Sequence, residues 1–151
     1  MVITVEKAKP RDSKDVWKIR NNPINRKFFH DKEEIKFKDH NKWFKKKYFK
    51  EDNLCFVCFS SIEKRAIGYC RYDLEDNHYL ISIAVDPTYQ NRGIGRIILD
   101  ATLDKVDKDV VAEILKRNTV SRKLFEGLSM INSGFKLFKE DKTTYYFKLN
   151  N

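Results

Sequence analysis

An apolar stretch, a turn with two glycines and an amphipathic stretch follow one another in the middle of the chain. His78–Val85 is rich in β-branched and aromatic residues and predicts a strand. Ile94–Leu103 repeats isoleucine and leucine at helical spacing and predicts an amphipathic helix. Between them, Gly93 and Gly95 lack side chains that would keep a ligand away from the backbone. Because the first N–H groups of a helix are unpaired and its dipole makes that end positive, this turn predicts a pyrophosphate-binding site.

The spacing in this turn excludes two other phosphate-binding loops. A P-loop requires Gly-Lys-Ser/Thr, which occurs nowhere in the chain. A dinucleotide-binding turn requires a third glycine three residues after the second, and Ile98 stands there. An ordinary strand–turn–helix corner, in which the glycines serve the turn alone, remains the alternative.

The composition is that of one globular domain. With 151 residues the chain can bury a single core, and we expect residues 1–151 to form one domain. Eleven Phe, seven Tyr and two Trp argue against disorder. The net charge of +9 favours anionic ligands, but acidic residues are interleaved with the lysines, so we expect no nucleic-acid partner.

Three cysteines raise the question of a metal or redox site. Cys55 and Cys58 form a C-x-x-C sequence within an apolar, strand-like run, and Cys70 is the third. Positions 55 and 58 of a strand point to opposite faces, so one metal ion could not easily bind both thiols. We therefore expect buried thiols, no metal and a reducing cytoplasm, with neither a signal peptide nor a membrane-spanning run.

Hydrophobic spacing and turn residues divide the chain into alternating elements. The predicted strands are Val2–Glu6, Leu54–Ser60, Ala66–Asp73, His78–Val85, Val110–Leu115, Phe135–Lys139 and Thr143–Leu149. The first predicted helix begins at Asp12 or Ser13 and ends before Asn21-Asn22-Pro23. Three further helices are predicted: one over Phe37–Phe49, one after Gly93, and one over Thr119–Met130 that closes at Ser133-Gly134. A linker is predicted at Ile24–Glu34. This order predicts an α/β (α+β) fold: a mixed, mostly antiparallel sheet of six to seven strands with about four helices.

Two blocks of the sequence resemble the GNAT superfamily of acyl-CoA-dependent N-acetyltransferases. Gln90-x-x-Gly93-x-Gly95 resembles the family signature [RQ]-x-x-G-x-[GA]. The segment from Asn118 through Ser121 to Phe125, followed by Gly-Phe, resembles its N-x-x-S-x-x-x-[YF]-x-x-x-G-F block. The order of elements is also similar to the GNAT fold over nearly the whole chain. The resemblance implies an acetyl-CoA-dependent N-acyltransferase whose sheet is splayed at the cofactor site.

The resemblance also implies how acetyl-CoA is bound. The backbone amides of the glycine turn would hold the pyrophosphate, and the Asn118 side chain would reach the cofactor. The main-chain N–H of Val85, at the splay of the sheet, would stabilise the tetrahedral oxyanion. The implied cofactor contacts are Ala84, Val85, Gln90, Asn91, Arg92, Gly93, Ile94, Gly95, Arg96, Asn118, Ser121 and Phe125.

Departures from the family pattern affect the mechanism. Phe125 stands where many members carry a tyrosine whose hydroxyl protonates the leaving thiolate, and residues Glu126–Asn132 insert extra positions before the Gly-Phe. Ser121 and Tyr79 are the alternative proton donors. The nearest candidates for the base that deprotonates the amine are His78 and Tyr79, with Glu75 just before the strand. A surface role for His78, a water relay, or an amine that arrives deprotonated remains open.

A narrower resemblance concerns the acceptor. Arg20-Asn21-x-Pro23, then Arg26 and His40-x-x-Trp43-Phe44, resembles a pattern of GNAT enzymes that acetylate nucleotide-linked amino sugars, including the pseudaminic acid type. It implies that Arg20, Asn21, Arg26 and His40 bind the substrate, and guanidinium groups suit a diphosphate.

Several functional alternatives remain open beside this acceptor. Similar patterns occur in acetyltransferases of ribosomal-protein N-termini and of polyamines. Core packing of the tryptophans would explain part of the pattern without any acceptor. A catalytically silent module that binds CoA, or a basic surface that binds RNA, would not need an acceptor at all. A homodimer is also left open. Under the leading interpretation the chain transfers acetyl by direct attack of a primary amine in a ternary complex.

Overall fold

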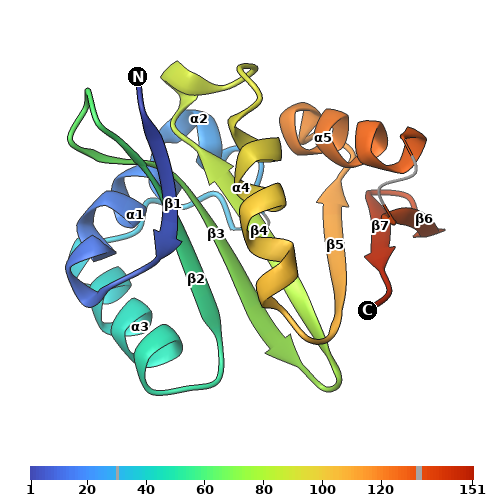
Figure 1. Ribbon diagram of the computed structural model, residues 1–151, viewed down its shortest axis with the longest axis horizontal. Helices are drawn as coiled ribbons and strands as arrows, with labels where there is room; N and C mark the ends of the chain where they lie inside the picture. Colours follow the sequence, from blue (N-terminus) through green and yellow to red (C-terminus); the bar gives the residue numbers. More distant parts are fainter. Residues whose placement is uncertain (30, 132–133) are drawn as a thin grey trace.

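The computed structural model describes residues 1–29, 31–131 and 134–151, which form one sheet with helices on both of its faces (Figure 1). Within these residues the sheet has seven strands in the order β1-β2-β3-β4-β5-β7-β6, and only β4 and β5 pair in parallel. The strands are β1 (Ile3–Lys7), β2 (Leu54–Ser60), β3 (Arg65–Glu75), β4 (His78–Val85), β5 (Asp109–Leu115), β6 (Lys136–Glu140) and β7 (Thr144–Leu149). The α-helices are α1 (Ser13–Arg20), α2 (Pro23–Arg26), α3 (Phe37–Phe49), α4 (Ile94–Thr102) and α5 (Thr119–Met130), and short 3-10 helices lie at η1 (Pro10–Asp12), η2 (Pro87–Tyr89) and η3 (Leu103–Lys105).

The mixed, mostly antiparallel architecture predicted from the sequence is confirmed. Helices α3 and α5 and strands β2 and β4 have the predicted bounds. The predicted closure of α5 involves Ser133, and the predicted insertion ends at Asn132; both residues lie outside the described part of the chain. Gly134, which follows them, has a left-handed φ of +98°. None of the described helices is long and apolar enough to cross a membrane.

The segment predicted as a linker at Ile24–Glu34 begins inside a short helix, and this part of the prediction was wrong. Helix α2 starts at Pro23, and the Asn22 side chain accepts a hydrogen bond of 2.9 Å from the Ile24 N–H. A proline at the first helical position has a φ suited to the helix and needs no N–H partner there. The proline that ends one helix therefore also starts the next one.

The two faces of the sheet carry separate apolar clusters. One cluster joins helices α1 and α3 to side chains such as Cys55 and Tyr69, and the other joins α4 and α5 to side chains such as Cys58 and Cys70. Cys55 and Cys58 thus point to opposite faces, as the strand periodicity predicts. All three thiols are buried, and the described residues contain no group of three or more potential metal ligands.

The sheet separates between β4 and β5. The parallel pairing covers His78–Leu80 of β4 and ends there, although the strand continues to Val85. Beyond this point β5 pairs with β7 alone among the described strands, and the divergence of β4 from β5 is visible in Figure 1. The splay predicted for the sheet is confirmed, and the residues that follow β4 lie at its edge.

Candidate active site

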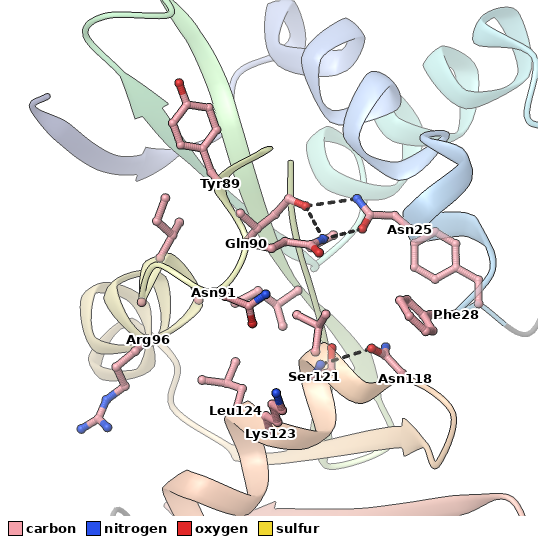
Figure 2. Close-up of a pocket in the computed structure, with 18 residues that line it drawn as sticks. Asn25, Phe28, Tyr89, Gln90, Asn91, Arg96, Asn118, Ser121, Lys123 and Leu124 are labelled. Atoms are coloured by element: carbon pink, nitrogen blue, oxygen red, sulfur yellow. Dashed lines mark hydrogen bonds between the residues drawn. The ribbon is translucent and has the colours of Figure 1, made fainter. Parts of the chain in front are cut away.

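The turn between β4 and α4 presents a row of unpaired backbone amides. In the described part of the chain, the N–H groups of residues 91–96 have no intramolecular acceptor, whereas the Ile97 N–H donates to the Gly93 carbonyl at 3.1 Å. All of these residues except Arg92 line a cavity of about 370 Å³ that also touches the start of α5 (Figure 2). Six free amides at a helix N-terminus form the kind of site that binds a pyrophosphate.

The two glycines of the turn have different structural roles. Gly93 is the N-cap of α4 and has a φ of +79°, which favours glycine, while an added Cβ would meet no atom within 4 Å. A Cβ on Gly95 would lie 3.2 Å from Leu124 Cδ2, so this glycine lets α4 approach α5 closely. Close approach of a ligand is therefore not the only reason for a glycine at either position.

A second cavity of about 340 Å³ lies at the splay of the sheet. It shares a set of lining residues with the first cavity, so the two adjoin: Phe28, Phe29, Ile83, Asn118 and Ser121. The loop of residues 27–36, between α2 and α3, covers part of both cavities with Phe28 and Phe29. The Arg117 side chain donates to the Phe29 carbonyl at 2.7 Å and ties this loop to the start of α5.

The backbone groups of Val85, at the end of β4, face the gap between β4 and β5, where Val85 lines the first cavity. The Asp86 N–H donates to the Ile67 carbonyl of β3 at 2.7 Å. In this antiparallel pairing the N–H and C=O groups of Val85 therefore point away from β3, toward the gap between β4 and β5. The Val85 carbonyl accepts from Asn25 Nδ2 at 3.2 Å and from Gln90 Nε2 at 3.0 Å (Figure 2). Its N–H has no strand partner on that side. This geometry suits the predicted oxyanion contact, which stays a prediction.

Residues 17–129 match the model of the family described as acetyltransferase (GNAT) family, which covers most of the chain. The chain belongs to the GNAT acetyltransferase family. A ribosomal protein bS18 alanine N-acetyltransferase of Escherichia coli K12 is 39% identical over 57 residues, which are 35% of this chain and 38% of that protein. The chain thus matches well under half the length of this curated relative.

Solved structures show the same GNAT fold. A putative phosphinothricin N-acetyltransferase has a TM-score of 0.79 at 19% identity, covering 99% of this chain and 98% of that one. The putative acetyltransferase yncA from Salmonella typhimurium, with its cofactor acetyl-CoA, has a TM-score of 0.78 at 18% identity, covering 99% and 94%. A phosphinothricin acetyltransferase from Sinorhizobium meliloti in complex with AcCoA also scores 0.78 at 18% identity, covering 99% and 89%. At this identity the likeness establishes the fold.

Most of the cofactor contacts implied by the GNAT resemblance line the first cavity, and two do not. Arg92 lines neither cavity; its exposed guanidinium lies 5.3 Å from the Tyr89 ring. Phe125 borders only the second cavity and is fully buried against Phe135 and Phe147, because its ring completes the core under α5. The residues that do line the first cavity are Ala84, Val85, Gln90, Asn91, Gly93, Ile94, Gly95, Arg96, Asn118 and Ser121.

Sequence reasoning missed Asn25, whose side chain links helix α1, the end of β4 and Gln90 by hydrogen bonds beside the first cavity. Its side chain is 5% exposed, donates to the carbonyls of Ile19 (2.9 Å) and Val85 (3.2 Å), and accepts from Gln90 Nε2 at 2.8 Å (Figure 2). The Gln90 amide is therefore used inside the protein rather than turned toward a ligand. A single asparagine in a segment expected to be a linker carries no sequence signal for such a role.

Replacing Asn25 by alanine is expected to lower the free energy of unfolding by roughly 1–3 kcal/mol, since the mutation removes the three hydrogen bonds of a buried side chain. Chemical denaturation measures the change. Asn77, exposed in the β3–β4 turn, provides the control: its alanine variant should stay within about 0.5 kcal/mol of the parent. Equal losses in both variants would contradict the organising role of Asn25.

The structure corrects the prediction that His78 or Tyr79 acts as the base or as the proton donor. Both residues lie at the start of β4, whereas Val85 ends it, and seven residues of extended chain span roughly 23 Å. Tyr79 is packed near Tyr72 in the core, and neither His78 nor Tyr79 lines either cavity. Ser121 does line both cavities, and its role as a donor stays a prediction.

Of the residues predicted to bind the acceptor, the structure brings Arg20 to a cavity and leaves the others elsewhere. His40 is 1% exposed; its Nε2–H donates to the Ser13 carbonyl at 3.0 Å, and its Nδ1 accepts from Arg20 Nη1 at 3.2 Å. The Asn21 side chain accepts from the Ile35 N–H at 2.8 Å and holds the loop. Arg26 lines neither cavity. Asn21 and His40 are therefore bonded inside the protein, through the loop and through the packing of α1 against α3.

The environment of His40 predicts a loss of stability at acid pH. Burial, and then the charge of Arg20, lower the pKa of His40 from 6.5 to about 4. Because the folded-state pKa is the lower one, the stabilisation is complete above pH 6.5 and is lost as the pH falls toward 4, by up to about 3 kcal/mol. Denaturation at several pH values measures this, and a His40→Gln variant should lose this component of the slope. An unchanged slope would contradict the prediction.

Proposed function

We propose that this protein transfers acetyl from acetyl-CoA to a primary amine, by direct attack within a ternary complex, in a single domain of residues 1–151. The row of free amides at residues 91–96 is the observation that carries the proposal. Two similar structures, from Salmonella typhimurium and Sinorhizobium meliloti, contain acetyl-CoA and support it.

The residues of the first cavity fit the anionic part of this coenzyme. Free N–H groups can bind the pyrophosphate oxygens, and the positive end of α4 adds to the attraction. Lys123 on α5 lines the cavity and adds positive charge, whereas the guanidinium of Arg96 on α4 points outward and pairs with Asp100 at 3.0 Å (Figure 2). The coenzyme supplies the thioester, and the adjoining second cavity is where we place the acceptor amine.

Glu113 is the proposed base. An ammonium has no lone pair, so the amine must lose a proton before it attacks. Glu113 lies on β5 and lines the second cavity at the splay, where a carboxylate can accept that proton. An acidic residue in the otherwise apolar strand Val110–Leu115 was a signal for this role, and the search for a base near β4 overlooked it.

The other steps use groups that line both cavities or end β4. The Val85 N–H would stabilise the oxyanion that forms when the amine attacks the carbonyl carbon. The thiolate released when the C–S bond breaks needs a proton, and Ser121 is the hydroxyl that lines both cavities. Phe125 offers no hydroxyl for this step, so proximity of the two substrates would supply much of the rate.

For the acceptor we propose a nucleotide-linked amino sugar, acetylated on its 4-amino group. The position of Arg20 in the second cavity supports this, since a guanidinium suits a phosphate. A protein N-terminus is the second candidate, favoured by the similarity to the ribosomal-protein alanine N-acetyltransferase.

A thiol-release assay tests the proposal with three acceptors: a UDP-linked 4-amino sugar, a peptide with N-terminal alanine, and spermidine. We expect acetyl-CoA to bind in calorimetry and CoA to be released only when an amine is present. Failure of acetyl-CoA to bind would refute the proposed activity, and release with the peptide alone would select the second acceptor.

A further inference from the structure

Three cations surround the indole of Trp43 near the second cavity. The distances to the ring centroid are 4.3 Å for Arg20 Cζ, 5.3 Å for Arg71 Cζ and 5.7 Å for Lys47 Nζ. Within the described residues, one carboxylate pairs with this group: Asp73 bonds to Arg71 and lies 3.4 Å from Lys47 Nζ. The cluster thus carries three positive charges against one negative charge.

The charge of Arg20 is the one without an acidic partner among the described residues. Its Nη1 donates to His40 Nδ1, and a ring nitrogen that accepts a bond from a guanidinium belongs to a neutral imidazole. The guanidinium is stacked on Trp43 and oriented by His40, so its position is set before any ligand arrives. Placing a partly buried cation without a counter-charge costs free energy, which an anionic ligand would offset.

Arg20 and Arg71 both line the second cavity, and so do three acidic residues. Arg71 lies on β3 and Glu113 on β5, with β4 between them, so their strands are at least about 10 Å apart. Asp31 and Glu33 come from the loop over the cavity. Arg71 and Glu113 therefore lie on opposite sides of β4, about two strand spacings or more apart, while Asp31 and Glu33 belong to the loop that covers the cavity.

The register of the sheet indicates where a reacting amine would lie relative to the cations. Arg71 pairs with Ser82, and Val85 is three residues further along β4, or roughly 10 Å. The Arg71 guanidinium is directed at Asp73 and Tyr48. Arg20, in contrast, follows Ile19, whose carbonyl shares Asn25 Nδ2 with the Val85 carbonyl, so Arg20 starts on the Val85 side of the cavity. A molecule that touches both regions needs only a few bonds between its amine and its anionic group, which suits a cavity of about 340 Å³.

We propose that the acceptor is a primary amine that carries an anionic group, a phosphate or a carboxylate, a few bonds from the nitrogen. Arg20 and Arg71 bind that group, and the amine is directed toward Glu113. This inference rests on the proposed function only in treating the second cavity as the acceptor site. It restricts the acceptor to primary amines that also carry a negative charge. Polyamines carry none and are therefore disfavoured.

Two matched pairs of probes test the proposal by calorimetry, with the protein alone and with the protein saturated with CoA. O-phosphoethanolamine is compared with ethanolamine, and β-alanine with β-alaninamide. We expect at least one anionic probe to bind about 10-fold more tightly than its neutral counterpart, or more. The pair with the larger preference identifies phosphate or carboxylate as the recognised group.

Three variants separate recognition of the anion from general charge effects. Arg20→Gln should abolish the preference, and Arg20→Lys should restore part of it, because the ammonium keeps the charge but not the forked geometry. Arg11→Gln removes a charge at an exposed position in η1 and should keep the preference. No preference in either pair, or equal losses in the Arg20→Gln and Arg11→Gln variants, would overturn the proposal. Acetyl-CoA affinity, measured on the same proteins, reports separately on the proposed function.

Discussion

A Gly93→Glu variant is expected to bind acetyl-CoA at least about 100-fold more weakly than the parent protein, a loss of about 2.7 kcal/mol. Two effects add. The residue has a φ of +79°, where a non-glycine residue costs roughly 1–2 kcal/mol and distorts the start of α4. The new carboxylate would also lie beside the row of free amides and repel the pyrophosphate. Since a Cβ at this position meets no atom within 4 Å, the cost to the fold should be limited to this backbone strain.

Gly127→Glu is the matched control for this experiment. Gly127 lies in α5, lines neither cavity, and also has open space around an added Cβ, but without a positive φ. The control variant should keep the parent affinity in calorimetric titration with acetyl-CoA. Equal affinities for the Gly93 and Gly127 variants would mean that the coenzyme does not use the amides of this turn.

A Glu113→Gln variant should lose about 10²- to 10⁴-fold in turnover with an accepted amine, because the glutamine amide cannot take up the proton of the attacking ammonium. The affinity for acetyl-CoA should not change, since Glu113 borders the second cavity and not the first. Steady-state kinetics with saturating acetyl-CoA, together with calorimetry, separate the two quantities. Glu113→Asp should recover part of the rate, because the carboxylate is retained.

Glu75→Gln controls for the loss of one acidic group. Glu75 is exposed at the β3–β4 turn and lines neither cavity, so its variant should turn over normally. A Glu113→Gln rate within about 3-fold of this control would contradict the assignment of the base. The proton would then leave through water or through Asp31 or Glu33, which also line the second cavity.

Features that depend on neighbouring residues could be predicted from the sequence. The strand, turn and helix from His78 to Thr102 form because each segment has its own periodicity, and the free amides follow from the start of a helix. The helix bounds at Phe37–Phe49 were also predicted correctly, since apolar spacing is a local signal. The opposite orientation of Cys55 and Cys58 needed only the two-residue repeat of a strand.

Features that depend on distant contacts could not be predicted in this way. Asn25 bonds to a carbonyl 60 positions away, and no local pattern encodes that contact. The motif that includes His40 was interpreted as an acceptor site, yet the packing of α3 on α1 buries the imidazole. His78 is close to Val85 in the sequence but far from it in space, because a strand is the most extended form of the chain.

The loop of residues 27–36 supplies much of the second cavity's lining: Phe28, Phe29, Asp31, Glu33 and Ile35. The described residues of this loop take no part in the sheet, and the side chains of Asn21 and Arg117, from outside the loop, bond to its backbone. The amides of residues 91–96 belong to a different segment. If the second cavity holds the acceptor, as proposed, substitutions in this one loop would change the selectivity among amines during evolution and leave the proposed coenzyme site unaltered.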